Sequence, residues 1–310
     1  MKLPVAIALL LLALPAFAAG SVRFALFGDT PYSVYEREQL PGLIRDMAEW
    51  KVDFAIHDGD IKNGHSRCDD GLYADILGAF QASVVPLVYV PGDNEWTDCA
   101  RPDCGRYDQR ERLAFLRKTF FPDERTLGRS PMKVVRQTGD GHGYPENSRW
   151  QTEDVLFVTL NIPGFDNNVG NAEEFEARDA ANRAWLREAF HRARRAALKG
   201  IVIVIQANPF LEADNEGKTK PGFQPFLDLL RSETAAFAGQ VVLVHGDTHH
   251  MQIDKPLKDR TTGETIGNFT RVETYGSPFM GWIEGIADPA DPAFFRFETH
   301  PWPAADRLPH

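Results

Sequence analysis

Four aspartates, each directly preceded by a glycine, are the residues of this sequence best placed to do chemistry together. They are Asp29, Asp60, Asp93 and Asp247. Each follows an apolar run of strand length, and the glycine lets the backbone turn sharply, so the next side chain can be presented at the strand end. A single Gly-Asp pair is ordinarily only a turn. Four such pairs at four strand ends predict one shared acidic site.

A shared acidic site needs compensating charge, because four carboxylates in one cleft repel one another unless they bind protons or cations. Two divalent metal ions would supply that charge. Two ions about 3.5–4 Å apart can hold both the attacking and the leaving oxygen of an in-line displacement at phosphorus. The spacing of the aspartates therefore indicates hydrolysis of a phosphate ester.

The elements that position these aspartates are predicted from apolar, strand-length runs that alternate with helical patterns. The expected strands are Val22–Phe27, Val52–Ile56, Val84–Val90, Val155–Asn161, Ile201–Ile205 and Val241–Val244, and the expected helices lie near residues 40–47, 71–81 and 172–198. This order is typical of an α/β fold, in which ligands bind at the carboxyl ends of the strands.

Two other segments depart from that order. Residues 97–150 mix Pro, Gly, Asp and Arg without a clear period, which predicts a loop-rich excursion. The last sixty or so residues contain three short apolar runs with no helix between them, at 270–275, 281–286 and 294–297, and these predict further strands.

The order of the motifs resembles that of the calcineurin-like metallophosphoesterase family, whose blocks are Asp-x-His, Gly-Asp, Gly-Asn-His-Asp/Glu, a strand-end His before Pro, and Gly-His-x-His. The corresponding segments here are Gly28-Asp29, Gly59-Asp60, Gly92-Asp93-Asn94-Glu95, Gln206-Ala207-Asn208-Pro209 and Gly246-Asp247-Thr248-His249. The similarity runs from Val22 to about Met251. It implies a four-layer αββα sandwich, a dinuclear metal centre, and hydrolysis of a phosphate ester by a metal-bound hydroxide.

The resemblance also implies roles for individual residues. Asp29 would bind one ion, Asp60 would bridge both, and His249 is the remaining histidine of the last block. Asp93 stands where the family has Asn, and Asp247 where it has the first His. The implied metal ligands are Asp29, Asp60, Asp93, Asn208, Asp247 and His249, and the implied catalytic residues are Asn94 and His249.

This sequence departs from the family pattern at several positions. Pro31 replaces the His of the first block, so that ligand is lost. Asn94 replaces the His near the leaving group, and an amide cannot donate a proton and be left neutral, which predicts attenuated catalysis. Ala207 occupies the position of the strand-end His. Gln206 or Asn208 could substitute, although strand alternation points both away from the direction of Ala207.

The predicted ligand set is rich in oxygen, which favours Mn²⁺, Mg²⁺, Ca²⁺ or iron over Zn²⁺. The expected substrate is a phosphorylated small molecule or a phosphodiester, and the sequence does not distinguish between them. A second hypothesis follows from the missing histidines: a non-catalytic protein of the same fold that binds a metal or a phosphorylated ligand. Asp93 and Asp247 still offer metal-binding oxygens, however, as in a site whose coordination is altered and not abandoned.

Composition bounds the remaining classes of function. Lys and Arg total 34 against 44 Asp and Glu, a net charge of −10, so broad nucleic-acid binding is not expected. Residues 1–18 have a cation at Lys2, an apolar run and the small-residue pattern Ala16-Phe17-Ala18, which predict a secretory signal peptide. Residues 19–310 are expected to form a single domain, secreted or periplasmic, with no later membrane-spanning segment.

Export would permit a disulfide bond among the cysteines Cys68, Cys99 and Cys104. Cys99 and Cys104 lie close enough in sequence to pair, and either could reach Cys68. The resemblance favours the pair Cys68–Cys99. A zinc site made of thiolates is not indicated, because no CxxC spacing is present.

Overall fold

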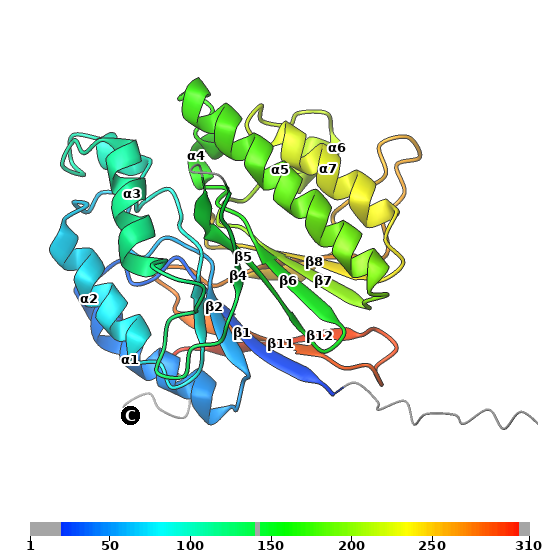
Figure 1. Ribbon diagram of the computed structural model, residues 1–310, viewed down its shortest axis with the longest axis horizontal. Coiled ribbons are helices and arrows are strands. Elements are labelled where there is room, and N and C mark those ends of the chain that lie inside the picture. Colours follow the sequence, from blue (N-terminus) through cyan, green and yellow to red (C-terminus); the bar gives the residue numbers. More distant parts are fainter. Residues whose placement is uncertain (1–19, 140–142, 304–310) are drawn as a thin grey trace, which may run out of the picture.

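The computed structural model describes residues 20–139 and 143–303, which form two β-sheets packed face to face between layers of helices (Figure 1). The predicted signal peptide, residues 1–18, lies outside the described residues. Among the described residues, none of the helices combines the length and apolarity needed to cross a membrane.

The first sheet carries the amino-terminal β-α units. Its strands, in spatial order, are β12 (Phe295–Pro301), β11 (Gly281–Ala287), β1 (Val22–Phe27), β2 (Phe54–His57) and β3 (Leu87–Tyr89). The strands β1, β2 and β3 run parallel, whereas β11 pairs antiparallel with both β1 and β12. The carboxyl ends of the three parallel strands therefore meet at one edge of the sheet.

The second sheet has a parallel centre and antiparallel edges. Its strands, in order, are β4 (Val135–Gln137), β5 (Tyr144–Thr152), β6 (Val155–Thr159), β7 (Gly200–Val204), β8 (Gln240–His245), β10 (Phe269–Glu273) and β9 (Gln252–Asp254). The central strands β6, β7, β8 and β10 are parallel. They are almost wholly buried, as expected for strands that are covered on both faces.

Helices cover the outer face of each sheet (Figure 1). The helices beside the first sheet are α1 (Val34–Glu49), α2 (Asp70–Gln81) and α3 (Gln109–Phe120), and the long helices beside the second are α5 (Ala172–Arg195) and α7 (Gln224–Ala235). The shorter elements are the 3₁₀ turn η1 (Asp98–Ala100), α4 (Gly164–Asn167) and α6 (Leu211–Asn215).

Three apolar cores separate these layers. One joins the first three helices to the first sheet and includes Leu40 and Phe120. A second lies between the two sheets and includes Phe24 and Phe157. The third joins α5 and α7 to the second sheet and includes Phe190. The predicted four-layer αββα sandwich is confirmed.

Residues 97–150 contain more regular structure than their composition indicates. They include α3 and the strands β4 and β5. Helix α3 buries Leu113, Leu116 and Phe120 on one face, and Asp108 caps it by accepting a hydrogen bond from the Glu111 backbone N–H at 2.9 Å. The many charges on the exposed face obscure this pattern in the sequence. Helix α7 was likewise not predicted.

The disulfide bond joins Cys68 and Cys99, as the family resemblance favoured. It ties the segment before α2 to η1, close to the carboxyl ends of β2 and β3. Cys104 is buried and not disulfide-bonded, and its thiol lies 3.0 Å from the carbonyl oxygen of Gly64.

Candidate metal centre

The four aspartates lie together at the carboxyl ends of the strands, two or three residues past β1, β2 and β8 and four past β3. The two sheets meet here, because the backbone N–H of Asp247 donates to Asp29 Oδ2 at 2.9 Å. Asp29, Asp60 and Asp247 have positive φ angles of 46°, 58° and 75°. Such angles are uncommon for non-glycine residues, and backbone strain of this kind concentrates at functional sites.

His249 lies beside Asp29. Its Nε2 is 3.4 Å from Asp29 Oδ1, and its Nδ1 is 2.6 Å from the carbonyl oxygen of Ser277. Burial opposes the charged form of the imidazole, but the Asp29 carboxylate and the Ser277 carbonyl outweigh that effect and raise the pKa of His249 to about 9. The imidazole is therefore oriented by one partner on each ring nitrogen.

Asp60 is held by Asn94 and Tyr32. The backbone N–H of Asn94 donates to Asp60 Oδ1 at 3.1 Å, and its side-chain Nδ2 donates to Asp60 Oδ2 at 2.8 Å. The Tyr32 hydroxyl is 3.0 Å from Asp60 Oδ2 and 3.3 Å from Asp29 Oδ1. Burial, and then the nearby carboxylates, raise the pKa of Tyr32, so its phenol stays protonated. Tyr32 thus links the two aspartates that follow β1 and β2.

Sequence reasoning missed Tyr32. The signal available was its position three residues after Asp29, in the loop between β1 and α1, where an aromatic hydroxyl can turn back toward the strand ends. Only the packing of β1 beside β2 brings the Tyr32 hydroxyl to Asp60.

Asp93 and Asp247 converge on the backbone of Gly164. A Cβ atom at Gly164 would lie 2.6 Å from Asp93 Oδ1 and 2.8 Å from Asp247 Oδ1. Asp93 Oδ1 is buried and has no hydrogen-bond donor. Burial, followed by the charge of Asp247, raises the pKa of Asp93, whereas burial and the charge of Asp29 raise the pKa of Asp247 to about 6. These carboxylates need either a proton or a cation.

Gln206 also lies in the site, on the side opposite to Ala207. Its Oε1 accepts a hydrogen bond from the Gly164 N–H at 2.6 Å, and its Nε2 is buried without a partner. Ala207 packs in the outer core with α5 and α7. Alternation after the strand therefore directs the Gln206 side chain toward the carboxylates and the Ala207 side chain away from them, into the outer core.

Asn208 lies at the edge of this group. Its backbone N–H donates to Asp247 Oδ2 at 3.0 Å, and its side-chain Nδ2 donates to Thr248 Oγ1 at 3.0 Å. The remaining side-chain oxygen accepts from the Phe210 N–H at 2.9 Å. The structure therefore places Asn208 beside Asp247, with its side chain already engaged in local hydrogen bonds.

A left-handed turn at α4 holds Gly164 against the carboxylates. Phe165, Asp166 and Asn167 all have positive φ angles, a costly run for non-glycine residues. The buried guanidinium of Arg178 fixes the turn by donating to Asn167 Oδ1 at 2.6 Å. The turn leaves the Phe165 side chain 74% exposed next to the site.

Further buried acids surround the four aspartates. Glu95 Oε1 accepts from the Tyr89 hydroxyl at 2.7 Å, and Asp58 Oδ2 accepts from the Thr274 hydroxyl at 2.8 Å. Burial raises the pKa of both carboxyls. So many buried acids with few cations between them fit a site that binds divalent ions, and Asp93 Oδ1, which is buried without a hydrogen-bond donor, is a candidate ligand atom.

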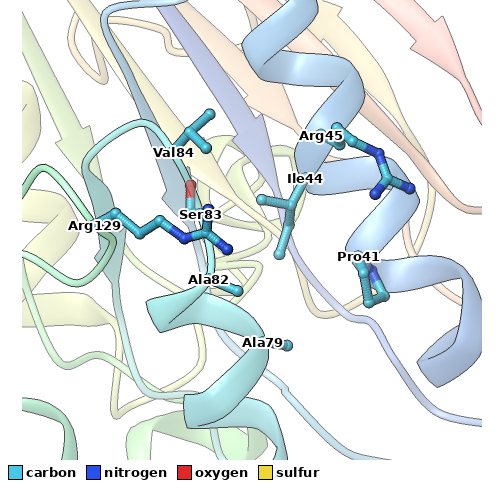
Figure 2. Close-up of a pocket in the computed structure, with 8 residues that line it drawn as sticks. All are labelled: Pro41, Ile44, Arg45, Ala79, Ala82, Ser83, Val84 and Arg129. Atoms are coloured by element: carbon cyan, nitrogen blue, oxygen red, sulfur yellow. The ribbon is translucent and has the colours of Figure 1, made fainter.

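The hollow between α1 and α2 is separate from this site. Its volume is about 240 Å³, and Figure 2 shows Ile44 at its centre with Arg45 and Arg129 on opposite sides. The lining residues Ala82, Ser83 and Val84 precede β3, so the hollow lies toward the amino end of that strand. None of the predicted ligands lines it.

Solved structures of phosphatases share this fold. A dimetal phosphatase from Danio rerio aligns with a TM-score of 0.57 at 11% identity, covering 90% of this chain and 96% of that chain. PhoD aligns with a TM-score of 0.57 at 12% identity, covering 88% of this chain. The purple acid phosphatase PPD1 from yellow lupin (Lupinus luteus) seeds aligns with a TM-score of 0.52 at 14% identity, covering 91% of this chain.

The aligned region covers 65% of PhoD and 51% of the lupin enzyme. No protein-family model matches this chain, and no curated protein matches it in sequence. At these identities the similarity concerns the fold alone, and it confirms the layered fold that the family resemblance implied.

Proposed function

We propose that the chain is a metal-dependent phosphoric ester hydrolase. It would act at the cluster of Asp29, Asp60, Asp93, Asp247 and His249 at the carboxyl ends of the strands, here called the carboxyl-end site. One observation carries the proposal: Asp93 and Asp247 converge beside Gly164, and the buried Asp93 Oδ1 has no hydrogen-bond donor. A cation there would neutralise the pair. The architecture shared with dimetal phosphatases supports the same chemistry.

Two divalent ions fit the donor groups present. Asp29, Asp60, Asp93, Asp247 and His249 would hold them, with Gln206 as an additional oxygen donor in place of the missing strand-end histidine. Bound ions of this kind lower the pKa of water and neutralise the charge of a phosphate group. The oxygen-rich set favours Mn²⁺, Mg²⁺, Ca²⁺ or iron over Zn²⁺.

The protein's own residues orient that centre. Asn94 and Tyr32 fix both oxygens of Asp60 through the hydrogen bonds described above, and the Ser277 carbonyl fixes the ring of His249. Asn94 does not take the place of the family's leaving-group histidine, because its side-chain amide donates to Asp60 and to the Lys62 carbonyl. Esters with good leaving groups should therefore react fastest.

Hydrolysis of mono- and bis-(p-nitrophenyl) phosphate with a panel of divalent metals tests the proposal. We expect metal-dependent turnover in the wild type, lowered at least about a hundredfold in Asp60→Asn, since the family resemblance implies that this carboxylate would help to hold both ions. Asp228→Asn, an exposed carboxylate of α7, is the control and should retain activity. Metal-dependent turnover that survives Asp60→Asn would refute the proposal.

A second candidate function rests on the missing histidines at Pro31, Asn94 and Ala207. A protein of this fold that binds metal or a phosphorylated ligand without hydrolysing it would give metal binding without turnover in the same assay. Calorimetric titration with Mn²⁺, compared between the wild type and Asp60→Asn, separates this outcome from a site that binds no metal.

We also propose that the protein is exported and acts as a single domain from residue 19. The pattern of residues 1–18 and the disulfide bond Cys68–Cys99 support export. Expression with and without residues 1–18, followed by fractionation of the cells, tests it. A full-length product that remains in the cytoplasm would argue against export.

A further inference from the structure

A second cluster of potential metal ligands lies away from the carboxyl-end site, on the strands β11 and β12. Among the described residues, only Glu284, Glu298 and His300 form a group of three or more His, Cys, Asp or Glu side chains whose ligand atoms all lie within 4.8 Å of one another. Glu284 and Glu298 are direct partners across the two strands, and His300 is opposite Trp282. All three side chains therefore share one face of the sheet.

Glu284 is the buried member of the cluster. It is 0% exposed, and its Oε1 accepts a hydrogen bond from the Arg23 guanidinium at 2.6 Å. Its other oxygen, Oε2, has no hydrogen-bond partner, although it is buried. Arg23 compensates the charge of the carboxylate through Oε1, but a buried Oε2 without a hydrogen-bond donor costs free energy unless something binds there.

His300 points its Nε2 at that same oxygen. The distance from His300 Nε2 to Glu284 Oε2 is 3.7 Å, longer than a hydrogen bond, and Nε2 has no hydrogen-bond partner either. Ligand atoms at about 2.0–2.2 Å from a tetrahedral zinc ion lie about 3.3–3.6 Å from one another. The observed separation is slightly longer than this range, so a small side-chain movement would let both atoms bind one ion.

The ring of His300 is held in this orientation by two tryptophans. Trp282 stacks on it with ring centroids 4.0 Å apart and an interplanar angle of 11°, and Trp50 contacts it at 4.4 Å. Trp282 is itself fixed, since its Nε1 donates to Asp46 Oδ2 at 2.9 Å. A rigid imidazole loses little freedom when it binds an ion.

Glu298 completes the group from the solvent side. Its side chain is 48% exposed, and its Oε1 lies 3.1 Å from Arg296 Nε. Since each carboxylate uses only one oxygen in its pair with arginine, one oxygen of each remains for an ion. One nitrogen and two carboxylate oxygens suit a divalent ion such as Zn²⁺, with a fourth position open to water.

We propose that Glu284, Glu298 and His300 form a zinc-type divalent cation site that joins the final strand β12 to β11. This site is separate from the carboxyl-end centre and does not depend on the proposed hydrolysis. Its ligands come from adjacent strands, so a bound ion would stabilise the outer edge of the first sheet.

Calorimetric titration of the metal-stripped full chain with Zn²⁺ tests the proposal. We expect the wild type to show one more zinc-binding event than His300→Gln and Glu298→Gln, or the same event weakened at least about tenfold. Glu298→Gln changes an exposed side chain, so it keeps the test valid if His300→Gln fails to fold. Binding at the carboxyl-end site should be equal in all proteins.

His191→Gln provides a matched control, because His191 Nδ1 also lies 3.7 Å from a glutamate, Glu188, but both side chains are largely exposed on α5. That variant should bind zinc as the wild type does. A spectroscopic readout is also available, since Cu²⁺ at His300 should quench the fluorescence of Trp50 and Trp282. Identical zinc binding and quenching in wild type, Glu298→Gln and His300→Gln would overturn the proposal and leave only a histidine-glutamate ion pair.

Discussion

At the scale of single residues, the site depends on side chains that orient the aspartates as well as on the aspartates themselves. Asn94 donates to both oxygens of Asp60, and Tyr32 bridges Asp60 and Asp29. Asn94 therefore acts on the centre through Asp60 in this structure. Groups that orient a ligand are commonly worth one to two orders of magnitude in metal affinity.

Asn94→Ala should accordingly weaken Mn²⁺ binding about 10–100-fold, because Asp60 Oδ2 loses one of the two donors that hold it and keeps only the Tyr32 hydroxyl. The backbone donor to Oδ1 is retained, so binding should not be abolished. Calorimetric titration measures the change. Asn171→Ala, which removes an amide that contacts Gln109 instead, is the control. Equal affinities in the two variants would contradict this role for Asn94.

At the scale of elements, the loops that follow β1, β2, β3 and β8 supply the aspartates, and the turn at α4 packs against Asp93 and Asp247. That turn places Gly164, which has no Cβ, where any larger residue would contact Asp93 and Asp247. Arg178 from α5 holds the turn from behind. The long helix thus contributes to the site without supplying a ligand.

Gly164→Ala should lower metal-dependent turnover at least about tenfold, because the new Cβ would lie 2.6 Å from Asp93 Oδ1, closer than van der Waals contact allows. Far-ultraviolet circular dichroism should be unchanged. Gly170→Ala is a matched control in the same segment, since its Cβ would have no atom within 4 Å. Full activity in Gly164→Ala would show that the carboxylates do not need this close approach.

At the scale of the whole molecule, the buried acids couple stability to pH and to metal. A carboxyl whose pKa is raised on folding stabilises the protein below its unfolded pKa, and this contribution is lost as pH rises toward the folded value. The stabilising contribution of Asp247 is lost as the pH rises from about 3.9, its unfolded pKa, to about 6, its folded pKa. His249 stabilises the folded protein fully below about pH 6.5, its unfolded pKa, and this stabilisation is lost as the pH rises through about 9.

Both effects have the same sign, so the melting temperature of metal-free protein should fall as pH rises from about 4 to about 9, and saturating Mn²⁺ should reduce the fall. Asp247→Asn should remove roughly 1–3 kcal/mol of the pH-dependent change in the free energy of unfolding between about pH 4 and 6. His249→Gln should flatten the part of the profile between about pH 6.5 and 9. Thermal melts in chelator and in Mn²⁺ measure this. A metal-free profile that rises over this range would contradict the assignment.

The sequence by itself determined the layered α/β architecture and the four aspartates, because apolar periodicity and Gly-Asp turns are local properties of the chain. It did not reveal α3 and α7, whose apolar faces are diluted by charged residues. It predicted that Gln206 and Ala207 point in opposite directions, but not that the side of Gln206 faces the carboxylates. Only the tertiary structure decided that Ala207 faces the outer core, that Tyr32 reaches Asp60, and that Gly164 meets Asp93. Those features depend on the pairing of β1 with β2 within the first sheet and on how the loops and sheets pack, which no local pattern in the sequence records.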